Sequence, residues 1–271
     1  MSFYLEKQGS NIWHGKFSSF VLPGLVHGIS TRFGGVSKAP YAAMNLALHT
    51  GDVAQDVWKN RRLFCESLGL CAERLCTPEQ VHGEQIVRVM SAHAGRGSRE
   101  YMDALPQTDA LITNERNLPL LLCFADCTPL LFYDPEHHAV GAAHGGWRGT
   151  VQKIGQKTVL AMQQQFGTRP EACLAAIGPS IGPCCYEVGE EVAGRFRAAF
   201  GNRAAELLHE TDGGIHLDLW QANQVQLEEI GMDVQNIDRA DTCTACNSDI
   251  FFSYRADQGT TGRIGAMIAL K

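Results

Sequence analysis

The sequence of 271 residues lacks several features that define large classes of protein. It contains no run of five or six basic residues, and its 23 lysines and arginines are outnumbered by 29 acidic residues, for a formal charge of −6. We therefore expect neither a nucleic acid nor an anionic membrane as its main partner. Low-complexity tracts and internal repeats are also missing, which argues against a solenoid or a propeller.

Membrane and export signals are missing too. No stretch of about eighteen uncharged apolar residues occurs. The first residues, MSFYLEKQGSNIWHGKF, do not combine a basic segment, an apolar core and a small-residue cleavage site. We therefore expect a cytoplasmic protein without a membrane partner. Its ten cysteines lie in a long chain without an export signal, so most should be reduced thiols, and a special one would act as a metal ligand or a nucleophile.

The chain does contain a series of short apolar runs separated by Gly, Pro and Asp. Their length and flanking residues favour strands over helices. The runs are LVHGIST, QIVRVM, DALIT, LPLLLCF, PLLFYD, AVGAAH, CLAAIG and AMIAL. Helical periodicity marks residues 54–69, residues 150–166 before Gly167, and a segment that Asp218 could cap and that ends at Gly231. Because helices and strands alternate, we expect a single α/β domain over residues 1–271.

One cysteine and two histidines stand at predicted strand ends. Cys127 lies in the loop ADCT between two apolar runs, His144 ends the next run, and His82 precedes a further strand. Side chains at strand ends can face a common cleft. Two imidazoles and a thiolate suit zinc or copper and leave a fourth position for water or substrate. Their separations match no zinc-finger pattern, however, so the residues alone also allow structural roles.

Other polar residues near these candidates allow two interpretations each. Arg148 lies in a glycine-rich turn that enters a predicted helix, where it would hold a phosphate or form a structural ion pair. The glycines of STRFGGVS raise the same two possibilities for Arg32. Asp126, next to Cys127, is a candidate general acid or base, a group that orients a metal ligand, or only a cap in the loop.

Two further segments, CCYEVG and CTAC, carry four cysteines. Adjacent cysteines such as Cys184 and Cys185 do not readily chelate one ion, and a thioredoxin-like redox pair would need its βαβ setting. We therefore expect these segments to pack and to form a cleft wall rather than to bind metal or undergo redox chemistry. Tyr186, in the first segment, is a candidate for stacking on a substrate.

Eight motifs occur in order over nearly the whole chain. They are HGISTRFGGVS, PYAAMNLALHTGD, EQVHGEQIV, TDALIT, ADCTPLLFYDP, AAHGGWRGT, AIGPSIGPCCYEVG and FFSYRADQGTTGR. Together they resemble the YfiH or laccase-domain family, also called polyphenol oxidase, purine nucleoside phosphorylase and peptidoglycan editing factor. The resemblance implies an α/β (α+β) fold of layered mixed β-sheets flanked by helices, similar to the catalytic domain of cytotoxic necrotizing factor toxins.

The resemblance also implies site residues. The metal ligands of the family fall on His82, Cys127 and His144, in its Gln-x-His-Gly, Ala-Asp-Cys and His-x-Gly-Trp-Arg-Gly motifs. It places Arg32 and Asn45 near the active cleft, where we expect them to contact substrate together with Arg148 and Tyr186. For catalysis we expect Asp126, Cys127 and His144.

The implied activity is phosphorolysis of adenosine, inosine and 5′-methylthioadenosine to a free base and ribose 1-phosphate. Adenosine deamination is implied as a second activity, and purine nucleosides and phosphate are the expected partners in one zinc-centred cleft. A copper phenol oxidase is one alternative, but the sequence lacks the His-x-His pairs of multicopper oxidases. The other is a cysteine amidohydrolase that edits peptidoglycan precursors, with Cys127 as nucleophile and His144 as base. His82 distinguishes the metal enzyme from the amidohydrolase, because a metal site requires this residue and a Cys-His dyad does not.

Overall fold

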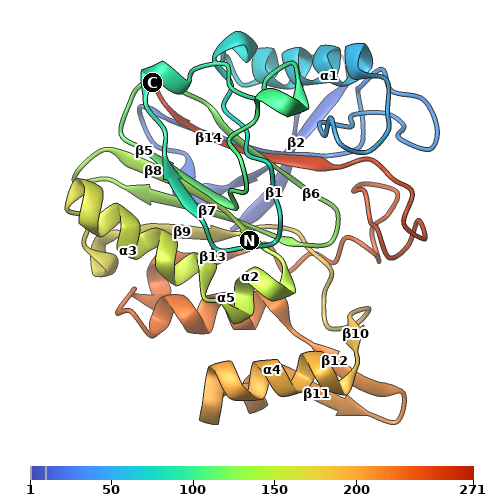
Figure 1. Ribbon diagram of the computed structural model, residues 1–271, viewed down its shortest axis with the longest axis vertical. Helices are drawn as coiled ribbons and strands as arrows, with labels where there is room; N and C mark the ends of the chain where they lie inside the picture. Colours follow the sequence, from blue (N-terminus) through green and yellow to red (C-terminus); the bar gives the residue numbers. More distant parts are fainter. Residues whose placement is uncertain (1, 10) are drawn as a thin grey trace.

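Two large β-sheets dominate the computed structural model, which describes residues 2–9 and 11–271 (Figure 1). The five-stranded sheet is antiparallel and has the order β1 (Phe3–Gln8), β2 (Ile12–Phe17), β3 (Leu25–Ser30), β14 (Ile264–Leu270), β6 (Leu120–Phe124). The six-stranded sheet has the order β13 (Ile237–Arg239), β9 (Leu174–Ile177), β7 (Thr128–Asp134), β8 (Ala139–Gly145), β5 (Ala110–Thr113), β4 (Ile86–Arg88). It is mixed, because β4 pairs with β5, and β13 with β9, in parallel.

The side-chain alternation of the strands arranges the chain in four layers. In β7, Leu130 and Phe132 pack beneath helices α3 (Ile154–Phe166) and α5 (Leu219–Glu228), whereas Leu131 faces the five-stranded sheet. In β6, Leu122 faces the six-stranded sheet and Leu121 packs beneath α1 (Ala54–Ser67). Because each sheet is covered on both faces, its central strands are continuous apolar runs. The predicted α/β (α+β) fold of layered mixed sheets flanked by helices is confirmed.

Most of the predicted elements are present. All eight apolar runs contain or form part of strands, and residues 54–69 contain α1. Asp218 caps α5 by accepting a hydrogen bond from the backbone N–H of Gln221 at 2.9 Å. The prediction of one continuous helix over residues 150–166 is wrong. The segment is interrupted at Lys153, whose left-handed φ of 62° separates α2 (Trp147–Val151) from α3.

One part of the fold was not predicted. Helix α4 (Glu190–Phe200) and the small sheet of β10 (Glu187–Val188), β12 (Gly214–Leu217) and β11 (Leu208–Thr211) lie at the end of the molecule opposite α1 (Figure 1). The helix buries Ala193, Phe196 and Phe200 at a helical spacing, so a signal for it was present. The strands have only two to four residues each, which is too short for a clear period-two pattern.

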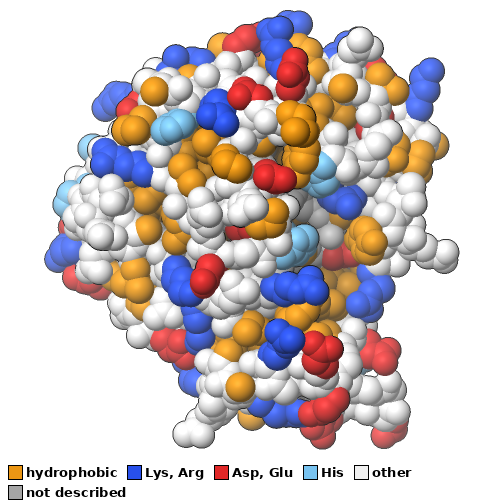
Figure 2. All heavy atoms as spheres, viewed as in Figure 1, with side chains coloured by type: hydrophobic (Ala, Val, Ile, Leu, Met, Phe, Trp, Pro, Cys, Tyr) orange, Lys and Arg blue, Asp and Glu red, His pale blue; other side chains and the backbone are white. Residues whose placement is uncertain are grey.

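The surface agrees with the charge pattern of the sequence. On the face shown in Figure 2, acidic and basic side chains are interspersed without a broad region of one sign. None of the helices in the described residues is long and apolar enough to cross a membrane.

A buried polar residue fastens the loop after β3 to helix α1. Asn60 lies on the apolar face of this helix, between Val57 and Phe64. Its Oδ1 accepts a hydrogen bond from the backbone N–H of Val36 at 2.8 Å. Its Nδ2 donates to a group of acceptors at 2.9 to 3.0 Å: Ser37 Oγ, Ala43 O and Asn45 O. A polar side chain is therefore required at this core position.

The substitution Asn60→Ala should lower the free energy of unfolding by about 2 to 4 kcal/mol, because it leaves buried backbone groups without partners. Lys59→Ala, at the neighbouring exposed position of the same helix, should change it by less than about 0.5 kcal/mol. Urea unfolding of both variants measures the difference. Equal midpoints would show that Asn60 does not hold the loop.

Candidate active site

The structure brings His82, Cys127 and His144 together. One ligand atom from each lies within 4.8 Å of the other two. Cys127 Sγ is 3.8 Å from His82 Nε2, and the two imidazole rings are 4.6 Å apart between centroids. Three separate segments supply these side chains: the loop before β4, the turn between β6 and β7, and the end of β8.

Two anchors hold the loop that carries His82. Gln80 forms a pair of hydrogen bonds with the backbone of Cys123 in β6, donating to its carbonyl at 2.9 Å and accepting from its N–H at 2.8 Å. The carboxylate of Asp109 accepts from the backbone N–H groups of residues 81, 82 and 83 at 2.7 to 3.1 Å. The loop can therefore keep His82 in a left-handed conformation, with φ of 61°.

Asp109 also orients His144. Its Oδ1 lies 2.8 Å from His144 Nδ1, and its carbonyl accepts from the backbone N–H of His144 at 2.8 Å. Both residues are buried. A histidine whose Nδ1 donates to a carboxylate presents Nε2 as its ligand atom, which is the usual arrangement around a metal.

The charges of the three groups depend on one another. Burial would raise the pKa of the Cys127 thiol, but the neighbouring His144 and His82 lower it to about 6. Burial opposes the charged form of His144, but Cys127 and Asp109 raise its pKa to about 9. Cys127 is thus readily ionised to the thiolate, which is the form that binds metals and acts as a nucleophile.

Gly146 allows the backbone to approach these side chains. A Cβ atom at this position would lie 3.0 Å from Cys127 Sγ and 3.1 Å from His82 Cδ2. Any larger residue at this position would therefore displace Cys127 or His82 by a few tenths of an ångström.

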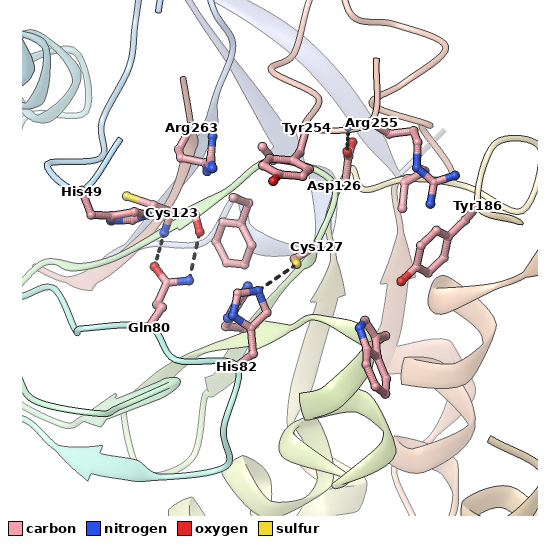
Figure 3. A pocket seen from close by; sticks show the side chains of 15 residues that line it. His49, Gln80, His82, Cys123, Asp126, Cys127, Tyr186, Tyr254, Arg255 and Arg263 are labelled. Carbon is pink, nitrogen blue, oxygen red and sulfur yellow. Dashed lines mark hydrogen bonds between the residues drawn. The ribbon is translucent and has the colours of Figure 1, made fainter. Parts of the chain in front are cut away.

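The three residues line a cavity of about 590 Å³. Figure 3 shows Cys127 between two groups of side chains, with His49 and Arg263 on one side and Tyr186 and Arg255 on the other. Burial, with the nearby charges of Arg263 and Arg61, lowers the pKa of His49 to about 4. The cavity therefore combines cationic, neutral polar and aromatic walls.

Asp126 lines the cavity, but both of its carboxylate oxygens are engaged. Oδ1 accepts from Thr244 Oγ1 at 2.6 Å, and Oδ2 accepts from the backbone N–H of Arg255 at 2.7 Å. Asp126 also has a left-handed φ of 82°, and its carbonyl accepts from the N–H of Ile181 at 2.9 Å. These contacts make Asp126 the junction of three segments beside Cys127.

Tyr186 lines the cavity, whereas Arg148 is not among the lining residues. Burial raises the pKa of Tyr186 to about 12, and the Arg255 guanidinium lies 5.4 Å from its ring centroid. Arg148 is exposed and lies over the ring of Trp147, at 4.6 Å from the centroid. Arg148 lies within helix α2, which begins at Trp147 rather than near residue 150 and has only five residues.

The structure does not bring Arg32 and Asn45 to the cavity. The Arg32 guanidinium donates to the carbonyls of Ala42 and Ser248 and lines a separate, smaller depression. Asn45 is fully buried and organises its own loop. Its Nδ2 donates to Asp52 at 2.9 Å, and its Oδ1 accepts from the backbone N–H of Arg263 at 2.9 Å. Asn45 thus supports a cavity residue without facing the cavity.

Several residues that line the cavity were not predicted as site residues from the sequence. They are His49, Gln80, Trp147, Tyr254, Arg255 and Arg263. All lie within motifs that carried the family resemblance, namely PYAAMNLALHTGD, EQVHGEQIV, AAHGGWRGT and FFSYRADQGTTGR. Those motifs were the available signal, although their spacing does not show which side chains face a common cavity.

Comparisons with known proteins point to one family. A family model described as multi-copper polyphenol oxidoreductase laccase matches residues 26–271. The purine nucleoside phosphorylase YlmD of Geobacillus stearothermophilus is 42% identical over 246 residues, which cover 90% of each chain. The purine nucleoside phosphorylase YfiH of Escherichia coli is 36% identical over 242 residues, which cover 89% of this chain and 92% of the relative.

Solved structures give the same result. The crystal structure of YlmD from Geobacillus stearothermophilus has a TM-score of 0.93 and 38% identity, and 98% of each chain is covered. That of the Bacillus licheniformis hypothetical protein YfiH also has a TM-score of 0.93, at 32% identity, with 98% of this chain and 99% of the other covered. The chain therefore belongs to the laccase-domain, or YfiH, family.

Proposed function

We propose that this chain is a purine nucleoside phosphorylase that works through one zinc-binding cleft and also deaminates adenosine. The observation that carries this proposal is the convergence of His82, Cys127 and His144 on a cavity of about 590 Å³. Pockets of this size accommodate small molecules such as a nucleoside. The relatives named purine nucleoside phosphorylase support the reaction class.

The donor set fits zinc. One thiolate and two imidazoles supply three ligands and leave a position for substrate, as in catalytic zinc sites. Copper also accepts this set, so phenol oxidation is proposed only as a side reaction of copper-loaded protein, to be measured against the zinc form. When bound, zinc supplies Lewis-acid polarisation of a substrate oxygen.

The walls of the cavity suit the two substrates of phosphorolysis. The aromatic side chains of Tyr186 and Trp147 offer surfaces for stacking on a purine. Across Cys127, Arg263 provides a guanidinium for phosphate, and His49 is neutral at pH 7 because its pKa is lowered to about 4. A phosphate oxygen placed there would form the new bond to ribose C1′ as the glycosidic bond to the purine breaks.

A multicopper oxidase is less well supported. Reduction of dioxygen to water requires four electrons, which such enzymes collect with several coppers held by histidines. Within residues 2–9 and 11–271, close groups of three or more potential ligands are the His82, Cys127 and His144 group and a group of four cysteines. Only the first contains histidine, so the described donors support one catalytic metal.

A cysteine hydrolase is the second candidate, and one observation favours it. Cys127, His144 and Asp109 are arranged as a nucleophile, a base and a carboxylate that orients the base. The pKa of Cys127 is also lowered to about 6. This arrangement does not need His82. Variants at His82 therefore separate the two candidates.

His82→Ala and Cys127→Ala should each lower the zinc content by one ion per chain, because each removes a ligand from the same site. Inosine phosphorolysis and adenosine deamination should both fall by more than about 100-fold, since one cleft serves both. Elemental analysis and parallel activity assays measure these losses. Cys71→Ala, at an exposed cysteine outside the cavity, is the control and should match the wild type.

Wild-type zinc content in both variants would contradict the assignment of the ligands. Loss of deamination with full phosphorolysis would contradict the shared cleft. If His82→Ala cleaved an amide substrate that Cys127→Ala could not, the hydrolase would be the correct candidate.

Arg263→Lys should raise the KM for phosphate roughly tenfold or more while leaving the KM for inosine unchanged, because lysine keeps the charge but loses the planar donor fork. Arg148→Lys should change the phosphate KM less than about twofold, since Arg148 is exposed and lies outside the cavity lining. Initial rates at varied phosphate test both variants. If Arg148→Lys raised the phosphate KM and Arg263→Lys did not, Arg148 would be the phosphate-binding residue, as the glycine-rich turn suggests.

A further inference from the structure

Four cysteines form a second cluster beside the cavity. Cys184 and Cys185 lie in the loop between β9 and β10, and Cys243 and Cys246 lie between β13 and β14. Their four Sγ atoms all lie within 4.8 Å of one another. Cys246 Sγ is 3.5 Å from Cys184 Sγ and 3.4 Å from Cys185 Sγ. Adjacent cysteines do not readily chelate one ion, but in this loop the sulfurs of both Cys184 and Cys185 lie next to Cys246 Sγ.

The separations fit four ligands around one ion. Thiolates at about 2.3 Å from zinc in a tetrahedron are about 3.8 Å from one another. The two separations from Cys246 Sγ are slightly shorter than this, and all four sulfurs lie within 4.8 Å of one another. A disulfide would involve only two of the four sulfurs and would require them to approach to about 2.05 Å.

Backbone groups also point at the cluster. Cys243 Sγ accepts hydrogen bonds from the N–H of Gly182 at 3.3 Å and from the N–H of Cys246 at 3.5 Å. Such bonds stabilise a thiolate and fix its direction, as bonds to metal ligands do. The spacing of Cys243 and Cys246 is the C-x-x-C spacing of one half of a structural zinc site. The other loop supplies the second half.

We propose that Cys184, Cys185, Cys243 and Cys246 bind a structural zinc ion, separate from the ligands in the cavity. Four thiolates leave no open position, so this ion would act on stability rather than on substrate. The proposal does not depend on the proposed function, because it uses none of the residues of the catalytic cleft.

The position of the cluster indicates what the ion would stabilise. The first loop carries Ile181 and Tyr186, which line the cavity on either side of its cysteines. The second loop carries Thr244, whose hydroxyl donates to Asp126 at 2.6 Å. The two loops already meet through the bond from Thr244 N–H to Ser180 O at 3.0 Å. A bound ion would stabilise the contact between these two loops and so the wall of the cavity that they form.

Zinc analysis of two double variants tests the proposal. His82→Ala/Cys127→Ala removes the cavity ligands and should retain one zinc ion per chain. Cys184→Ser/Cys246→Ser should contain one ion fewer than the wild type, whereas Cys71→Ser, at another exposed cysteine, should match it. A zinc-free His82→Ala/Cys127→Ala protein, or a wild-type zinc content in Cys184→Ser/Cys246→Ser, would overturn the proposal.

Cobalt provides a measurement that does not depend on the cysteine variants. Metal-depleted His82→Ala/Cys127→Ala protein titrated with Co²⁺ should develop thiolate-to-cobalt charge-transfer absorption of a tetrahedral four-thiolate site, complete at one equivalent. Absence of this absorption would overturn the proposal. A free-thiol count in the denatured wild-type chain that is two short of its ten cysteines would reveal a disulfide and overturn it as well.

Discussion

The carboxylate of Asp109 is the constraint on which the catalytic cleft depends. It accepts three backbone N–H bonds from the loop of His82 and a fourth bond from the Nδ1 of His144. Burial would raise the pKa of Asp109, but these bonds and the charge of His144 lower it, so the residue stays ionised. One buried negative charge therefore sets the position of one proposed metal ligand, His82, and the ligand atom of another, His144.

The sheets place Asp109 where it can do this. It directly precedes β5, which pairs with β8, and the pairing of Ala110 with Ala143 sets Asp109 beside His144. The turn between β6 and β7 supplies Cys127, and β6 also anchors the His82 loop through Gln80. The cleft thus lies where both sheets end. Segments from both halves of the chain complete its walls, including the loop that we propose is locked by the four-cysteine cluster.

Much of the fold could be predicted from local sequence, whereas most contacts in the candidate site could not, for a physical reason. The doubly buried strands are apolar runs, and Gly167 and Asp218 mark helix ends through their own conformation and hydrogen bonds. The proposed ligands His82, Cys127 and His144, which the structure brings together, were predicted from strand ends and from motifs that resemble the family. The contacts of Asp109 and the roles proposed for Arg263 and the four cysteines depend on pairings between segments far apart in the chain, which no local spacing encodes. Lys153 interrupts a periodic segment by adopting a left-handed φ, which its side chain does not predict.

The most direct test is the zinc affinity of Asp109→Asn. Removal of the charge that orients His144 and the His82 loop should weaken zinc binding about 10- to 100-fold, and excess zinc should restore phosphorolysis. Asp134→Asn is the matched control, because Asp134 is also buried and accepts from His137 Nδ1 and two backbone N–H groups, but lies at the end of β7 that is far from Cys127 and His144. It should bind zinc as the wild type does. Unchanged zinc affinity in Asp109→Asn would contradict the central role of this carboxylate.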